Sequence, residues 1–260
     1  MKKNWWKSFY DEYLAAMLLE QADDEIEATL GFLEKRLSLP EGARIYDQCC
    51  GTGRLSLPLL RRGYDVIGVD QAALYIQKAS QNTGLENLGG EFLVADAFEY
   101  TPEEPVDAVI NWWTSFGYAE KDEQNAKMIV RAFESLRPGG VFALDFLNLP
   151  GVLRNFARDV VTRCPFEAGE LVLHLESHLN LEEGAIEKTW RYFLPDGRRV
   201  VHETRVCMYM PNELARFFAL AGFQEIQIFG SVHGESLNMD SPRCIVVGRK
   251  PEAAEIGERE

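Results

Sequence analysis

Three acidic residues, each at the end of an apolar run, are the side chains of this chain best placed to do chemistry. Asp47 precedes a glycine turn at residues 51–53, Asp70 ends the next apolar run, and Asp96 ends a third. Glycines permit a tight turn and let a ligand approach the backbone without a Cβ in the way. A carboxylate at the tip of the following strand can accept hydrogen bonds from both hydroxyls of a ribose. The pattern therefore predicts an adenosine site.

The glycine turn does not fit the fingerprints of dinucleotides or nucleoside triphosphates. Ser56 replaces the third glycine of G-x-G-x-x-G, and no G-K-[S/T] follows. Asp47 would place negative charge near a bound pyrophosphate, which is unfavourable. The same carboxylate suits a ligand whose amino group and sulfonium lie over the turn, which predicts S-adenosylmethionine (SAM). Asp96 could then accept from the adenine amino group while Phe98 covers the ring. The alternative for a single acid is that it only ends a strand or caps a helix.

These motifs resemble those of the class I SAM-dependent methyltransferases, and the resemblance runs through most of the chain. Residues 47–53 are similar to the family's glycine motif, Asp70 to its ribose-binding acid, and residues 96–98 to its adenine motif. Residues 111–117 resemble the motif beside the transferred methyl group, and residues 136–140 the turn into the fifth strand. The resemblance implies an enzyme of the small-molecule N- or O-methyltransferase type, with SAM as cofactor and S-adenosylhomocysteine as product.

Two residues of the glycine motif depart from the family's usual pattern. Cys49 stands where a small residue is usual, and it narrows the room under the methionine part of the cofactor. Gln48 stands where an aliphatic residue is usual, and its amide needs a partner within an apolar strand. These departures leave open a SAM-binding partner or regulatory subunit that has lost catalysis. Different SAM chemistry on the same scaffold, or a macromolecular substrate, would also fit the motifs.

The order of apolar runs predicts an α/β fold with a Rossmann-like, mostly parallel seven-stranded sheet and helices on both faces. By analogy with the resembled family, the last strand should run antiparallel. Period-two alternation from about residue 171 to residue 210 predicts a three-stranded antiparallel insertion after the fifth strand. The expected strands are 44–49, 64–70, 91–96, 106–113, 140–147, 224–229 and 244–248, with a helix at 212–221 before the last two.

Four parts of the chain follow from this order. Residues from about Trp5 to Leu37 read as helical and begin with an aromatic cluster. The cluster either packs on the main domain or forms a lid over the site, and the resemblance favours the lid. The expected parts are a helical lid (1–38), a SAM-binding core (39–150 and 211–250), an antiparallel insertion that caps the substrate (151–210) and an acidic tail (251–260).

Composition narrows the class of partner. The 260 residues are 46% hydrophobic, which is enough for a sizeable core, and carry a formal net charge of −14. That charge disfavours a nucleic-acid substrate, because phosphate binding normally needs a basic patch. It favours a small neutral or cationic substrate. The five cysteines lack metal-site spacing, so no metal and reduced thiols in a cytoplasmic compartment are expected. The sequence predicts neither a signal peptide nor a membrane-spanning segment, and the oligomeric state stays open.

The candidate site residues fall into three groups. Methyl transfer to a neutral amine needs no base, whereas a hydroxyl or carbon acid needs one; nitrogen is favoured over oxygen by the acidic field and by family analogy. His174 qualifies as a base only if its strand face turns into the pocket. The cofactor candidates are Tyr10, Tyr13, Asp47, Cys49, Gly51, Thr52, Gly53, Arg54, Asp70, Gln71, Asp96, Ala97, Phe98, Asn111 and Trp112. The substrate candidates are Trp113, Tyr118, Asn148, Tyr209 and Arg243, and the catalytic candidates are His174, Tyr118 and His233.

Overall fold

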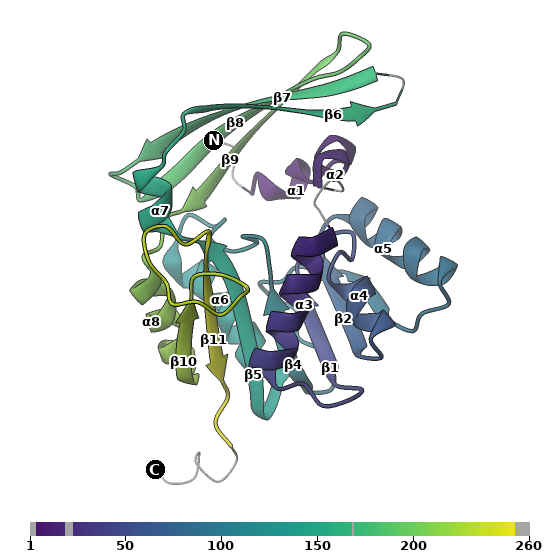
Figure 1. Cartoon of the computed structure of the whole chain (residues 1–260), viewed down its shortest axis with the longest axis vertical. Coiled ribbons are helices and arrows are strands. Elements are labelled where there is room, and N and C mark those ends of the chain that lie inside the picture. Colours follow the sequence, from purple (N-terminus) through teal and green to yellow (C-terminus); the bar gives the residue numbers. More distant parts are fainter. Residues whose placement is uncertain (1–3, 19–22, 168, 253–260) are drawn as a thin grey trace.

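The chain folds around a central seven-stranded sheet (Figure 1). The computed structural model describes residues 4–18, 23–167 and 169–252, so the predicted acidic tail lies outside these ranges from residue 253 onward. The strands are β1 (Arg44–Gln48), β2 (Asp65–Asp70), β3 (Glu91–Val94), β4 (Val106–Asn111), β5 (Leu136–Leu147), β10 (Gln224–Phe229) and β11 (Arg243–Arg249). Their order is β10-β11-β5-β4-β1-β2-β3, and β11 runs antiparallel to both its neighbours. The predicted Rossmann-like sheet is confirmed.

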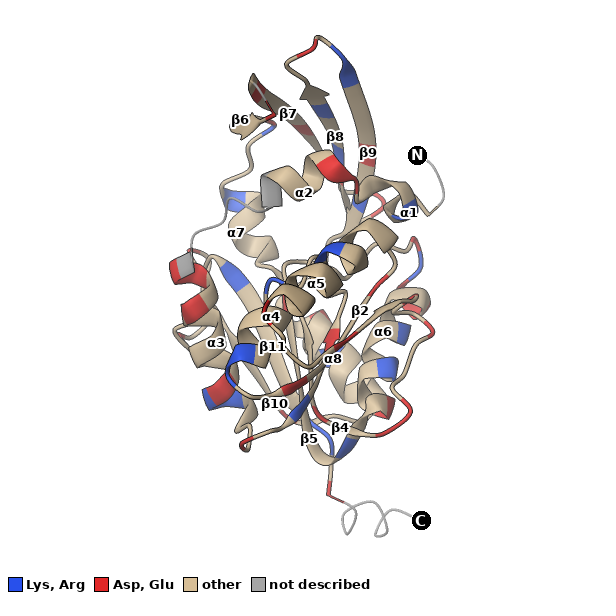
Figure 2. Cartoon of the chain, turned by 90° about the vertical axis from the view of Figure 1, so that its right-hand side faces the viewer, with Lys and Arg blue, Asp and Glu red and all other residues tan. Residues whose placement is uncertain are grey.

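Helices cover both faces of this sheet. On one face lie α3 (Asp23–Leu37) and α4 (Ser56–Arg61), with α5 (Ala73–Leu85) beside α4. The other face carries α6 (Asp122–Ser135) and α8 (Pro211–Ala221). Pro211 opens α8 at a position where its missing amide hydrogen has no intrahelical partner to lose. None of the helices in the described ranges is long and apolar enough to cross a membrane. In the view of Figure 2, basic residues are interspersed with acidic ones along the helices around the sheet.

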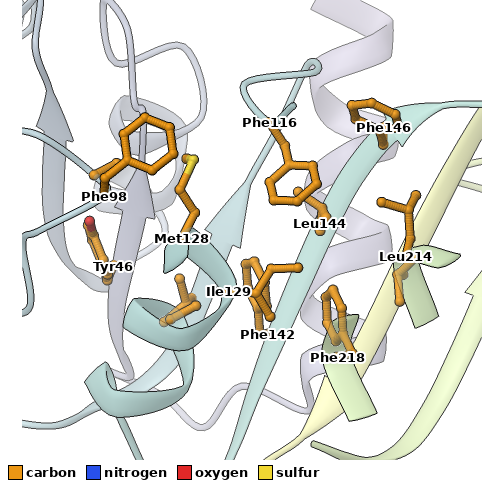
Figure 3. Packing of buried hydrophobic residues seen from close by; sticks show 14 of the residues in the cluster. Tyr46, Phe98, Phe116, Met128, Ile129, Phe142, Leu144, Phe146, Leu214 and Phe218 are labelled. Carbon is orange, nitrogen blue, oxygen red and sulfur yellow. The ribbon is translucent and has the colours of Figure 1, made fainter. Parts of the chain in front are cut away.

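The core on the α6 and α8 side is largely aromatic (Figure 3). Phe142 of β5 stacks on Phe218 of α8, with ring centroids 5.0 Å apart and planes 6° from parallel. Phe116 contacts Phe146 edge-on at 5.9 Å. Strands covered on both faces can be apolar at every position, which is why β4 and residues 141–147 of β5 are apolar over most of their length.

A second, antiparallel sheet follows β5 and stands above the carboxyl ends of the central strands (Figure 1). It has four strands, so the prediction of three was one short. The missed strand is an edge strand that contains Pro165, and its exposed Val160 and Val161 break the alternation expected of a half-buried strand. The elements are α7 (Leu149–Arg154), β6 (Asp159–Phe166), β7 (Gly169–Asn180), β8 (Ala185–Phe193) and β9 (Arg199–Cys207), paired in the order β6-β7-β8-β9.

The N-terminal segment lies between the two sheets (Figure 1). The expected helical stretch is divided into α1 (Trp6–Phe9), α2 (Glu12–Leu18) and α3. The division falls at Asp11, whose Oδ1 accepts hydrogen bonds from the backbone amides of Tyr13 and Leu14. An aspartate in this arrangement caps a new helix, so α2 begins afresh instead of continuing α1. The turn allows the aromatic residues of α1 to face the space below the four-stranded sheet.

The side-chain amide of Gln48 is buried within an apolar strand, and both its nitrogen and its oxygen have hydrogen-bond partners there. Its Nε2 donates to the Met128 carbonyl oxygen at 3.2 Å, and its Oε1 accepts from Asn111 Nδ2 at 3.0 Å. Gln48 and Asn111 are both fully buried, on neighbouring strands β1 and β4. The partner that the sequence demanded for Gln48 is therefore Asn111.

Gln48→Leu should lower the free energy of unfolding by about 1–3 kcal/mol, because the Asn111 amide then stays buried without its acceptor. The double variant Gln48→Leu/Asn111→Leu removes both polar groups and should recover part of that loss. Urea denaturation of both variants checks this. A double variant no more stable than Gln48→Leu alone would contradict it.

Candidate functional site

A cavity of about 300 Å³ lies at the carboxyl ends of the central strands, under the inner face of the four-stranded sheet. Open α/β sheets bind ligands at this edge. The wall includes the glycine turn, the ends of β2 and β3, the loop after β4, the aromatic residues of α1, and the inner faces of β8 and β9. Most of the wall is apolar, which limits the water that can accompany a ligand.

Asp70 ties the glycine turn to the end of β2. Its Oδ2 accepts from the Gly51 amide at 3.0 Å and its Oδ1 from the Ala72 amide at 2.8 Å. Burial raises the pKa of Asp70, while these backbone hydrogen bonds oppose the rise. Each carboxylate oxygen retains a second lone pair, so Asp70 can still accept two hydrogen bonds from a ligand in the cavity.

The glycine turn leaves room for a ligand at Gly51. That residue has φ +57°, and a Cβ placed on it would lie 3.9 Å from its nearest neighbour, a Tyr75 ring carbon. At Gly53, by contrast, a glycine is needed for close packing, because a Cβ there would lie 3.3 Å from the Cβ of Ala79 on α5. Open backbone beside a carboxylate with free lone pairs is an arrangement that fits a ribose and the chain attached to it.

Asp47 lies beneath the turn and is absent from the cavity wall. Its Oδ2 accepts from the Ser56 hydroxyl at 2.5 Å, and the side chain is only 3% exposed. Burial raises the pKa of Asp47 to about 7, with the Ser56 hydrogen bond lowering it and nearby Asp70 raising it further. The expected direct contact of Asp47 with a cationic ligand is therefore replaced by a buried contact with α4.

The loop after β4 brings Trp113, rather than Asn111 or Trp112, to the cavity. Asn111 is fully buried against Gln48, and Trp112 packs in the core against Phe32. Trp113 lines the cavity, with the Arg54 guanidinium 3.9 Å from its ring centroid. Trp112 therefore faces the core and Trp113 the site.

Trp113 and Thr114 both have the left-handed backbone conformation, with φ +53° and +63°. That conformation is costly for side chains of this size and needs outside support. Asp145, which is 1% exposed, supplies it by accepting from the Trp113 amide at 2.9 Å. Arg243 forms a bidentate ion pair with Asp145 at 2.7 and 2.5 Å and donates to Thr114 Oγ1 at 2.7 Å. Arg243, expected to bind substrate, instead holds this loop in place.

Two tyrosines meet in the cavity wall. The Tyr10 and Tyr118 hydroxyls lie 2.5 Å apart, and Tyr118 donates to the Thr114 carbonyl at 2.8 Å. Since a hydroxyl has a single hydrogen, Tyr10 must donate to Tyr118. Burial raises the pKa of both tyrosines, so both hydroxyls are neutral near pH 7. Tyr118 can therefore orient a ligand, but it is not poised as a base.

An aromatic wall closes the cavity opposite the glycine turn. Trp5 contacts Tyr118 with centroids 4.8 Å apart, and Phe9 contacts Trp190 of β8 at 5.0 Å. Tyr13 does not join this wall, because it packs against Tyr192 beneath the four-stranded sheet. The predicted cofactor residues that do line the cavity are Tyr10, Cys49, Gly51, Thr52, Arg54, Asp70, Gln71, Asp96, Ala97 and Phe98.

The predicted bases lie away from the cavity. The register pairs His174 with Arg191 and Leu175 with Trp190. Trp190 lines the cavity, so His174 is on the outer face, where it contacts Asp159 at 3.0 Å. The condition set for His174 as a base is thus not met. His233 is in the loop before β11, with its amide bonded to Ser231, and is also absent from the cavity wall.

Two expected substrate residues take other places. Tyr209 donates to Asp122 Oδ1 at 2.7 Å and accepts from Asn125 Nδ2 at 2.8 Å, away from the cavity wall. Asn148 borders a neighbouring second cavity, and its amide nitrogen bonds to the carbonyls of Asn238 and Ser241. Over the described ranges, no group of three or more His, Cys, Asp or Glu side chains is placed to hold a metal ion.

Sequence reasoning missed the residues that β8 and β9 present to the cavity, namely Ile186, Lys188, Trp190, Thr204 and Val206. They alternate with outward-facing residues, so the same period-two pattern that was read on β7 could have found them. The position of the sheet over the site, and hence which face looks inward, was the missing information.

Comparison with known proteins agrees with this geometry. Residues 45–140 match the family model of a methyltransferase domain. The glycine/sarcosine N-methyltransferase of Aphanothece halophytica is 24% identical over 216 residues, covering 81% of this chain and 77% of that protein. Several ribosomal RNA methyltransferases match less than half of this chain. The chain spans 52% and 29% of the length of the first two curated relatives it matches.

Two solved structures share the fold over 94% of this chain. The CcbJ methyltransferase of Streptomyces caelestis has a TM-score of 0.78 and 18% identity, with 99% of its chain covered. The sugar N-methyltransferase KedS8 of a Streptoalloteichus species has a TM-score of 0.73 and 19% identity, with 94% covered. The match over residues 45–140 is to a methyltransferase domain, as the motifs predicted, and the fold of the chain is that of these two methyltransferase structures.

The raised pKa of Asp47 makes a prediction about stability. Folded Asp47 stays protonated up to about pH 7, whereas an unfolded aspartate ionises near 3.8. The wild type should therefore lose stability relative to Asp47→Asn as the pH rises from about 4 to about 7, and the difference should stop growing above pH 7. Three pKa units at about 1.4 kcal/mol each set an upper limit of about 4 kcal/mol. Urea denaturation across this range, with exposed Asp240→Asn as control, measures it; a constant difference would refute the raised pKa.

Proposed function

We propose that this protein transfers the methyl group of SAM to an amine of a small molecule. The observation that carries the proposal is Asp70, a carboxylate with free lone pairs fixed to the glycine turn at the edge of a small, mostly apolar cavity. Glycine/sarcosine N-methyltransferase is one relative whose similarity extends over most of this chain, including the region of the four-stranded sheet. The ribosomal RNA methyltransferases match less of it, and a net charge of −14 is unfavourable for RNA.

In this proposal, the residues around the glycine turn hold SAM. Asp70 accepts from the ribose hydroxyls, and Asp96 with Ala97 and Phe98 surrounds the adenine. Gly51 lets the backbone approach the ligand closely. The methionine part of SAM lies near Cys49, Thr52 and Arg54. Tyr10 and Gln71 are further proposed contacts of the cofactor. All of these residues line one cavity. When bound, SAM supplies the electrophilic methyl group.

The remaining task of the chain is to align the acceptor nitrogen with that methyl group and to exclude water. We assign this to residues 1–38 as a lid and residues 151–210 as a cap. Tyr118 and Trp113 are the proposed contacts for the acceptor. A neutral amine needs no base for the transfer, in keeping with the placement of His174 and His233 outside the cavity wall.

The cellular compartment is part of the proposal. Cys50, Cys207 and Cys244 are buried thiols outside any disulfide, and Cys49 is a partly exposed one. Unpaired thiols are typical of a reducing compartment, so we propose the cytoplasm.

Asp70→Ala should weaken SAM binding by about 100-fold, since hydrogen bonds to a charged acceptor contribute about 1.5–3 kcal/mol each. Calorimetric titration of SAM measures this, and Asp70→Asn, which keeps one carbonyl acceptor, should lose less. Asp65→Ala, at the exposed start of the same strand, is the matched control. Equal SAM affinity in wild type and Asp70→Ala, with both folded, would refute the cofactor assignment.

Turnover tests the activity itself. The purified protein, SAM and a pool of small-molecule amines should produce S-adenosylhomocysteine above a control without the pool. Fractions of the pool then lead to the acceptor. SAM binding without product from any fraction would contradict the small-molecule proposal, and would favour a macromolecular substrate or a subunit without catalysis.

A further inference from the structure

A second cavity adjoins the first and shares three wall residues with it. It measures about 410 Å³ and lies between the start of α7, the loop before β11 and the inner face of β7. Leu147, Ile186 and Lys188 line both cavities. Asn148 fastens the β5–α7 connection to the β11 loop through Asn238 and Ser241, so the far wall of this cavity is held in place.

Three polar side chains form a row across the inner face of the sheet at this junction. The strand register pairs Ser177 of β7 with Lys188 of β8, and Lys188 with Thr204 of β9. Directly paired residues have their Cβ atoms about 4.5–5.5 Å apart, so neighbouring members of the row can act on one ligand group. Ser177 borders the second cavity, Thr204 the first, and Lys188 both.

Lys188 is the charged member of this row. Within the described ranges its amine has no hydrogen bond or ion pair, and burial alone lowers its pKa. Arg205, the neighbour of Thr204 on β9, is also a buried cation, but it has hydrogen-bond partners within the chain. Its guanidinium donates to the Glu183 carbonyl and to the Cys207 sulfur. An ammonium group largely removed from water without a partner is costly, so a partner supplied by a ligand is strongly favoured.

The hydroxyl of Thr204 is a second hydrogen-bond donor available to a ligand. Its Oγ1 accepts from Trp190 Nε1 at 2.9 Å, which leaves the hydroxyl hydrogen to donate. Thr204 is 2% exposed, and the described residues offer that hydrogen no acceptor. Ser177 is likewise buried, with no side-chain hydrogen bond to the described part of the chain. A group that only accepts hydrogen bonds would satisfy all three side chains.

We propose that the row Ser177–Lys188–Thr204 binds an acidic group of the methyl acceptor, a carboxylate or a phosphate. The acceptor is then an amine that carries an acid: the acid sits at the junction of the two cavities, and the amine points into the first. This proposal rests on the proposed function, because it names the substrate class of the same site. The net negative charge of the protein does not prevent the binding of such an anion. Distant charges are screened by salt, so the hydrogen-bond donors that contact the anion decide whether it binds.

The row can be tested without knowing the acceptor. Protein with ¹³C-labelled lysine side chains, saturated with S-adenosylhomocysteine, is titrated separately with acetate and with inorganic phosphate. The Lys188 signal, assigned by its loss in Lys188→Met, should shift saturably with at least one of the two anions, and which one responds separates carboxylate from phosphate. The signal of exposed Lys121 should stay constant. An unmoved Lys188 signal with both anions would overturn the proposal.

Turnover provides the second arm. The amine pool is loaded on an anion exchanger at a pH above the pKa of its amines, where an amine that also carries an acid has a net negative charge, and activity should reside in the retained fraction. Lys188→Met should lower kcat/KM by about 30-fold or more, as expected when one partner of a buried ion pair is removed, with SAM affinity unchanged. Thr204→Val should lower it less, and Thr189→Val, on the outer face of the same sheet, should not. Activity confined to the unretained fraction, or intact in Lys188→Met, would refute the acidic acceptor. Failure of SAM binding in the wild type would instead refute the proposed function.

Discussion

The site depends on one interaction, the two hydrogen bonds that the Asp70 carboxylate accepts from the backbone on either side of it. The amide of Gly51 comes from the turn after β1, and the amide of Ala72 from the start of α5. Because these bonds use the backbone, they fix the glycine turn against β2 whatever side chains the turn carries. The same carboxylate reaches the cavity, so the group that shapes the turn is also the group that can bind a ribose.

On the opposite side of the cavity, a second buried carboxylate holds the loop after β4 in place. A buried Asp145, paired with Arg243, stabilises two consecutive left-handed residues, Trp113 and Thr114. Thr114 in turn accepts through its carbonyl from Tyr118, which receives the hydrogen bond of Tyr10. The central sheet thereby positions the loop, the loop positions a tyrosine, and the tyrosine anchors the N-terminal segment. A cavity closed by such a chain of contacts can align two reactants and keep water out.

The sequence predicted what depends on local signals and missed what depends on register. Apolar runs that end at Asp47, Asp70 and Asp96 are visible without a structure, and so is the succession of the central strands along the chain. Which face of β7 looks inward is not, because a shift of one residue exchanges the two faces of a strand. His174 could therefore be named as a base only on the condition that its face turns inward, and Lys188 was overlooked. The edge strand β6, which contains Pro165, was not predicted for a related reason. An exposed edge strand lacks the apolar alternation that marks half-buried strands.

A crystal structure of the protein with S-adenosylhomocysteine tests the central claim most directly. The ligand should occupy the cavity above the glycine turn, with both ribose hydroxyls on Asp70, the adenine between Asp96 and Phe98, and the sulfur directed toward Trp113 and Tyr118. The four-stranded sheet should remain over the site, with Lys188 facing the open space beside the sulfur. A ligand bound elsewhere, or a ribose without contact to Asp70, would contradict the assignment of this cavity as the methyl-transfer site.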